Sequence, residues 1–202
     1  MKKLPFLLII LFSVSTIENH TAKAKDFPFQ GTQIQTALFA DMPLVPKKLK
    51  LVVSGTYFTN PEKDVHFFFG YGGVQWQVCK WFWIAPKVGV AANWAGQFPL
   101  IVSLWMGAAM FDGLLSAFVE SEVYLNQDVR DYYGFYSLDV HPRKWFSVGI
   151  QAEQVNAGVM FGPHVEFNYK IFTFGFHYYF GAQEENRGHG PRIFLKLHFS
   201  SG

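Results

Sequence analysis

The sequence predicts an all-β fold, a transmembrane up-and-down antiparallel β-barrel of about ten strands, with eight strands as the alternative count. Apolar and polar residues alternate at period two through most of the chain, which indicates strands with one face of each kind. Aromatic residues reach 19% while charged residues are only 16%, against about 25% charged in an ordinary soluble domain. Outward apolar side chains in contact with lipid would account for this composition.

The first 24 residues have the pattern of a Sec signal peptide. A basic start at Lys2 and Lys3 is followed by an apolar run over residues 4–14 and by the triplet Ala22-Lys23-Ala24. The run is shorter than the roughly 20 residues of a spanning helix, so we expect cleavage after Ala24. Cleavage removes the formal net charge of +2, which leaves no basic excess for binding nucleic acid.

Residues 25–46 are expected to form an N-terminal arm or plug that precedes a barrel over residues 47–202. Residues 32–40 alternate only weakly, and Pro43 and Pro46 follow them. A further strand is the alternative, but it would give an odd strand count, which is unusual for a single-chain bacterial barrel.

Residues 98–119 are long and apolar enough to suggest a membrane helix, with Asp112 as the only charged residue. However, Asp112-Gly113 lies near the middle of this stretch, and Asp-Gly between apolar runs is a strong hairpin signal. Glu120 and Glu122 follow on one parity of the second half. Two carboxylates are ordinary on the inner face of a strand and expensive in a membrane helix, so two strands are predicted.

Turn residues divide the rest of the chain in the same way. The predicted strands are 47–58, 65–78, 82–92, 99–110, 114–125, 132–140, 145–154, 158–169, 171–180 and 192–199. Short and longer polar connections alternate between them, with residues 155–157 as a short exception, which predicts periplasmic turns at one end and external loops at the other. Within 65–78 the apolar parity changes at Gly72-Gly73, where we expect a β-bulge.

Over roughly residues 47–199 the chain resembles the bacterial outer-membrane β-barrel superfamily. The resemblance rests on the signal pattern, the alternation, the near-terminal Phe199 and aromatic residues at the predicted strand ends. These aromatic residues are Trp81, Trp83, Trp145, Tyr132, Tyr133, Tyr178 and Tyr179. The resemblance implies an outer-membrane location, contact with membrane lipid, and insertion by the barrel assembly machinery, although Ser200-Ser201-Gly202 follow the aromatic residue here.

The inner face is expected to carry a network of paired charges that fills the lumen. A barrel of eight to ten strands has an interior mostly filled by side chains, and buried charges need partners of the opposite sign. The predicted members are Glu120, Glu122, Asp139, Glu153, Glu166, Lys87, Lys196 and Arg192, and Lys48, Lys50 and His198 are expected on the same face. This predicts a structural or interaction role without catalysis or cofactor.

Three residues are weak catalytic candidates. His164 and Glu166 share one face of a strand, and a turn at Tyr169-Lys170 would bring His177 beside His164, so that a histidine polarised by a carboxylate could act as a general base. Two ligands are too few for zinc, and no metal is expected. The alternatives are a narrow diffusion channel, an outer-membrane enzyme acting on lipid A or peptides, and a soluble lipocalin-like barrel with its faces reversed. The charged segment 181–191 could contact an external ligand.

Overall fold

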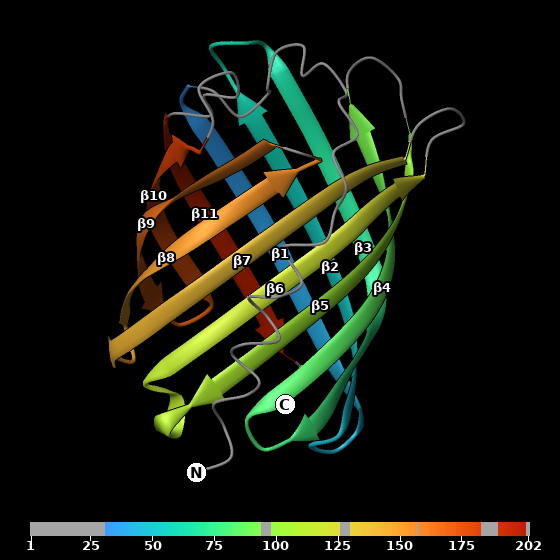
Figure 1. Ribbon diagram of the computed structural model, residues 1–202. Helices are drawn as coiled ribbons and strands as arrows, with labels where there is room; N and C mark the ends of the chain where they lie inside the picture. Colours follow the sequence, from blue (N-terminus) through green and yellow to red (C-terminus); the bar gives the residue numbers. More distant parts are fainter. Residues whose placement is uncertain (1–30, 94–97, 126–129, 157, 183–189, 201–202) are drawn as a thin grey trace.

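The chain folds into a closed β-barrel of eleven strands and one short 3-10 helix (Figure 1). The computed structural model describes residues 31–93, 98–125, 130–156, 158–182 and 190–200. The strands are β1 (Gln33–Val45), β2 (Leu49–Asn60), β3 (Val65–Cys79), β4 (Phe82–Asn93), β5 (Leu100–Met110), β6 (Leu115–Leu125), β7 (Arg130–Arg143), β8 (Phe146–Val155), β9 (Gly158–Tyr169), β10 (Phe172–Gly181) and β11 (Gly190–Ser200), and the helix η1 is Phe111–Gly113. The predicted all-β barrel is confirmed, whereas the count of ten strands is wrong by one. The predicted signal peptide, residues 1–24, lies outside the described residues.

The additional strand is β1, in the segment from which an arm or plug was expected. It pairs antiparallel with β2 and parallel with β11, from Gln33 opposite Arg192 to Asp41 opposite Ser200, and so closes the barrel. Pro43 lies beyond the last residue pair with β11. A proline lacks the N–H that a ladder requires, so this position costs the parallel pairing nothing.

Because the strand count is odd, the first and last strands of the barrel run in the same direction. Neighbouring strands are antiparallel except for β1 and β11, which run in the same direction. Gln33, the first residue of β1, therefore lies at the opposite end of the barrel from Ser200, the last residue of β11. An even number of antiparallel strands would place both residues at the same end. We call the end with turns at 46–48, 80–81, 111–114, 144–145 and 170–171 the short-turn end, and the other the long-loop end (Figure 1).

The two faces of the barrel wall differ in chemistry. Outward side chains are apolar and exposed, for example Val88 and Ile150, each 61% exposed. Inward side chains are buried and many are polar or charged; the buried members of this kind include Lys87, Ser103, Glu122, Ser147, Gln151, Glu153, His164, His177 and Arg192. In the part of the chain that the structure describes, no helix is long and apolar enough to cross a membrane.

The β-bulge expected at Gly72-Gly73 is wrong. Pairing of β3 with β2 runs without interruption from Trp76 to Val65, and Phe68 points outward, 51% exposed. Tyr71 points inward and packs with Ala91 and Ile101, among other aromatic rings, in an apolar cluster. The apolar parity changes because the inner face itself turns apolar toward the long-loop end, while the register stays constant.

Candidate functional site

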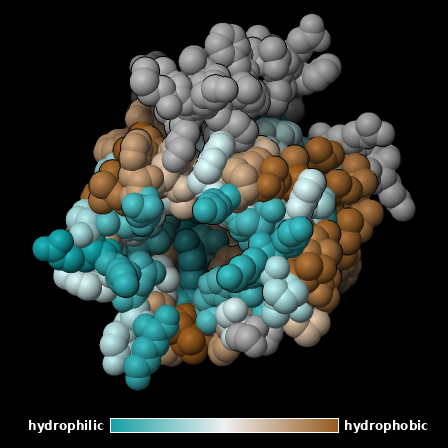
Figure 2. All heavy atoms as spheres, turned by 90° about the horizontal axis from the view of Figure 1, so that it is seen from below, coloured by the Kyte–Doolittle hydropathy of each residue, from teal (hydrophilic) through white to brown (hydrophobic). Residues whose placement is uncertain are grey.

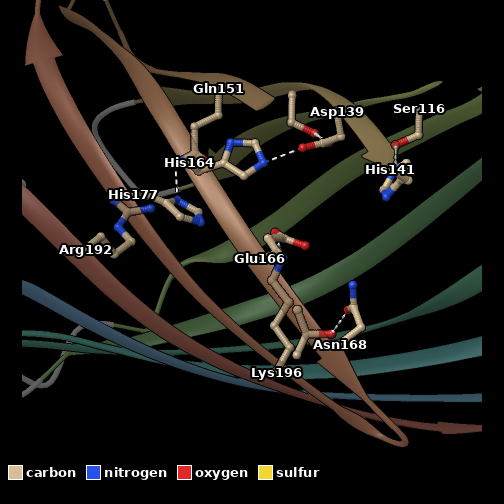
Figure 3. A network of polar contacts seen from close by, with 12 residues as sticks. Ser116, Asp139, His141, Gln151, His164, Glu166, Asn168, His177, Arg192 and Lys196 are labelled. Carbon is tan, nitrogen blue, oxygen red and sulfur yellow. Dashed lines mark hydrogen bonds and ion pairs between the residues drawn. The ribbon is translucent and has the colours of Figure 1, made fainter. Parts of the chain in front are cut away.

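The strand register places one row of polar side chains across the inner face. From β7 round to β1 the successive partners are Asp139, Gly149, His164, His177, Arg192 and Gln33. Residues that are partners in neighbouring strands point to the same face of the sheet. The row therefore runs along the inner wall through six strands, from Asp139 in the half of β7 nearer the short-turn end to Gln33 at the long-loop end of β1, and Figure 3 shows several of its side chains together with their neighbours.

Arg192 and Glu153 form the central ion pair of this network. The Arg192 guanidinium binds both carboxylate oxygens of Glu153, with Nη2 donating to Oε2 at 3.0 Å. Arg192 Nε donates to Gln33 Oε1 at 2.7 Å, and the Tyr179 hydroxyl donates to Glu153 Oε1 at 2.6 Å. The two charged side chains are 4% and 1% exposed. Such a buried pair is tolerated because its remaining donors and acceptors are also satisfied.

His164 is paired with Asp139, which lies two strands away. His164 Nε2 contacts Asp139 Oδ1, and Ser137 Oγ donates to Asp139 Oδ2 at 2.9 Å. Gly149 lies between them on β8, where an added Cβ would be 2.5 Å from Asp139 Oδ1 and 2.9 Å from His164 Cε1. The absence of a side chain at Gly149 thus allows the pair to form across the intervening strand.

The three catalytic candidates are not assembled as the sequence pattern suggested. His177 lies directly opposite His164, with ring centroids 5.0 Å apart. Glu166, however, accepts a hydrogen bond from Lys196 Nζ at 3.2 Å, away from both histidines (Figure 3). The carboxylate on His164 is that of Asp139, so the predicted His164–Glu166 couple is replaced by two separate pairs.

A second cluster surrounds Lys87 and Glu122 on β4 and β6. Lys87 is buried, with Nζ 2.9 Å from the centroid of the Trp105 ring, and it interacts electrostatically with Glu120 and Glu122. Glu122 accepts hydrogen bonds from Tyr124 at 2.8 Å and from Tyr71 and Ser103 at 3.1 Å. All eight residues that the sequence assigns to the lumen network thus lie on the inner face.

Neutral residues complete these clusters and were not expected from the sequence. Gln33 and Tyr179 bind the Arg192–Glu153 pair, and Gln151 contacts both His177 Nδ1 and the Tyr179 hydroxyl. The sequence spacing could have identified two of them. Gln151 is two residues before Glu153 and Tyr179 is two residues after His177, so each shares a strand face with a residue that was predicted. Lys48 was placed on this face but lies exposed in the turn before β2.

The lumen is open to solvent at the short-turn end. Asp41 there binds Lys50, His198 and Ser200, each at 3.0 Å, and His198 is 63% exposed at its side chain. Figure 2 looks into this end and shows a hollow ringed by hydrophilic side chains. Beside η1 a cavity of about 410 Å³ is lined by residues that include Ser116, His141, Arg143 and Lys144.

The buried histidines are poorly placed for catalysis. His164 and His177 do not line the 410 Å³ cavity. They are only 3% and 4% exposed. Ser147 Oγ and His164 Nδ1 are buried without a hydrogen-bond partner, and the Ser137 hydroxyl binds Asp139, so among the described residues no serine hydroxyl is bonded to the His164 ring. Among the described residues, no group of three or more His, Cys, Asp or Glu is placed to hold a metal ion.

Comparison with known proteins assigns no family: no family model, no curated protein and no solved structure matches the chain.

Proposed function

We propose that this protein is a small bacterial outer-membrane barrel with a lumen closed by a charged, hydrogen-bonded network, and that it has a structural or interaction role without catalysis or conduction. The single observation that supports this most strongly is the contrast between the two faces of one wall. The outer face presents side chains such as Val88, Ile150 and Phe161, at least half exposed, while the inner face holds the ion pairs. Exposing so many apolar side chains to water would be energetically unfavourable, whereas contact with the hydrocarbon of a bilayer is favourable.

Closure of the sheet supports the same proposal. Hydrocarbon offers no hydrogen bonds, so a β structure can cross a bilayer only if no strand edge is left unpaired. The parallel pairing of β1 with β11 removes the last two edges.

The burial of the Arg192–Glu153 ion pair supports the absence of conduction. Arg192, Glu153 and Tyr179 are bonded to one another along the inner wall formed by β8, β10 and β11, and all three are buried from solvent. The hydrophilic hollow at the short-turn end would therefore be a vestibule that ends inside the barrel.

Two measurements on the refolded protein and one fractionation of cells test the proposal. Unboiled and boiled samples should migrate differently on a gel, and the protein in planar bilayers should give no steady unitary currents. The matched variant Arg192→Ala/Glu153→Ala/Tyr179→Ala, which removes these buried lumen side chains, should conduct in the same bilayers and so show that insertion has occurred. Steady unitary steps from the unaltered protein would overturn the closed lumen, and recovery in the soluble periplasmic fraction would overturn the membrane location.

A further inference from the structure

Six cations lie on four of the five turns at the short-turn end. We call these residues the basic rim: Lys47, Lys48, Lys80, Arg143, Lys144 and Lys170. All six are exposed. The fifth turn, at η1, carries Asp112, the acidic residue of these turns.

The cations of the basic rim are not used by the lumen network. Within the described ranges none of the six forms an ion pair with a carboxylate, whereas Lys50, Lys196 and Arg192 inside the barrel each do. Two cations of the rim contact uncharged groups: Arg143 Nη1 donates to the Pro142 carbonyl at 3.0 Å, and Lys170 Nζ lies 5.3 Å from the Tyr169 ring centroid. The rim therefore presents positive charge to whatever surrounds this end.

Each turn of the rim except the first also carries an aromatic residue beside its cation. Trp145 follows Lys144 and is 57% exposed, and Tyr169 precedes Lys170 and is 69% exposed. Trp81 follows Lys80. Tryptophan and tyrosine are enriched at the level of lipid headgroups, where the ring contacts hydrocarbon and its polar atom contacts water. The rim thus lies where the apolar outer band ends.

The opposite end has the opposite charge. Its connections 61–64, 126–129 and 182–189 contain five acidic and two basic residues. In the described part, Glu62 and Asp64 are exposed, and hydrogen bonding with Thr32 lowers the pKa of Glu62, so this carboxylate is charged at neutral pH. Charge is therefore polarised along the barrel axis, and the positive pole is the short-turn end.

We propose that the basic rim binds the phosphate groups of anionic phospholipids in the leaflet that faces the short turns, and so fixes the depth and direction of the barrel. The four turns join β1 to β2, β3 to β4, β7 to β8 and β9 to β10, and are distributed round the closed barrel. One bound peptide or phosphate ion would reach only one part of such a ring, whereas a leaflet of headgroups meets all of it. Each cation near an anionic surface adds attraction that falls off within a Debye length. The proposal rests on the proposed insertion into a bilayer.

The test measures lipid selectivity of the barrel in vesicles by electron paramagnetic resonance with spin-labelled lipids. The quantity is the relative association constant of phosphatidylglycerol against phosphatidylcholine, taken from the motionally restricted fraction. The unaltered barrel should prefer phosphatidylglycerol about five-fold, as expected for one cation acting on one headgroup. The variant Lys48→Gln/Lys80→Gln/Lys144→Gln/Lys170→Gln leaves only Lys47 and Arg143 of the rim, and should lower the preference to less than about half.

Two further variants separate local binding from net charge and from misfolding. Adding Glu62→Lys and Asp64→Lys to the glutamine variant restores the net charge at the wrong end, and the ratio should stay as low as in the glutamine variant. Arginine at the four rim positions should keep the preference. No preference in the unaltered barrel, or its recovery by the far-end lysines, would overturn the proposal. Gel mobility reports insertion separately. A barrel that inserts without lipid preference contradicts only the proposed lipid binding by the basic rim, and a barrel that never inserts contradicts the proposed function.

Discussion

At the scale of single residues, the ion pair of Arg192 and Glu153 is the contact on which lumen stability depends most. Both side chains are almost completely buried, and each has further hydrogen bonds to neutral neighbours. In such a site the pair itself adds little net stability, but removing one partner leaves an uncompensated buried charge.

We therefore expect Arg192→Met to lower the free energy of unfolding by about 3–5 kcal/mol. The double variant Arg192→Met/Glu153→Gln should recover a large part of the loss, because it leaves no unpaired charge. Lys50→Met is the matched control: its pair with Asp41 is at the open end, with the Lys50 side chain 42% exposed, and should cost less than about 1 kcal/mol. Urea unfolding in lipid vesicles, followed by tryptophan fluorescence, measures all three. Equal losses for Arg192→Met and Lys50→Met would contradict a sealed lumen.

Gly149 gives a second prediction at this scale. An added Cβ there would collide with the Leu138 carbonyl oxygen and would also crowd Asp139 and His164, while at Gly72 nothing lies within 4 Å. Gly149→Ala should therefore destabilise the barrel by about 1–3 kcal/mol, and Gly72→Ala should change stability by less than about 0.5 kcal/mol. The same unfolding experiment applies, and a neutral Gly149→Ala would argue against the Asp139–His164 contact.

The sequence predicts which face of the sheet the candidate site residues occupy, but not which residues they contact. Parity places Glu166, His164 and His177 on one face, and the turn at Lys170-Ile171, one residue later than expected, sets His177 directly opposite His164. Parity does not reveal which carboxylate a histidine meets, because Asp139 reaches His164 across a strand through the space left by Gly149. That contact depends on the register of three strands, which alternation along one segment does not determine.

At the scale of the element, β1 shows where pattern recognition fails. The other ten strands were predicted at nearly their observed bounds, because their outward residues are strongly apolar. In β1 the outward positions include Ile34 and Leu38 but also Thr36, and two prolines follow. The usual even strand count then weighed against a strand. Only the pairing with both β2 and β11 reveals its role.

The parallel closure predicts a specific disulfide. In a Cys79→Ser background, Thr36→Cys with Leu195→Cys should crosslink on mild oxidation, because these residues are direct partners in the β1–β11 register. The offset pair Thr36→Cys with Leu197→Cys should not, because its Cα atoms would be about 8 Å apart, beyond disulfide reach. Gel mobility with and without reductant measures the bond. Failure of the direct pair, or preferential crosslinking of the offset pair, would contradict the eleven-strand closure.

At the scale of the whole molecule, the barrel is asymmetric along its axis. Toward the long-loop end the inner face holds the apolar cluster around Tyr71 and Ile101 and, on β8 and β11, the Arg192–Glu153 pair, whereas the short-turn end is hollow and hydrophilic (Figure 2). An odd number of strands is compatible with this arrangement because one parallel pair closes the sheet. The sequence predicted the two faces but not this gradient, since aromatic residues such as Phe69 and Tyr71 on an inward parity looked like a shift of register.

The most direct test of the whole account compares neighbouring residues on opposite faces of β8. In a Cys79→Ser background, Val148→Cys replaces an outward residue that is 39% exposed, and Ser147→Cys replaces an inward residue that is fully buried. In vesicles, a maleimide carried on a fatty acyl chain and confined to the bilayer should label position 148 and spare position 147, while a water-soluble maleimide should label neither. Labelling of position 147 by the bilayer probe with position 148 spared, or reaction of position 148 with the water-soluble reagent, would contradict a barrel with its apolar face in lipid.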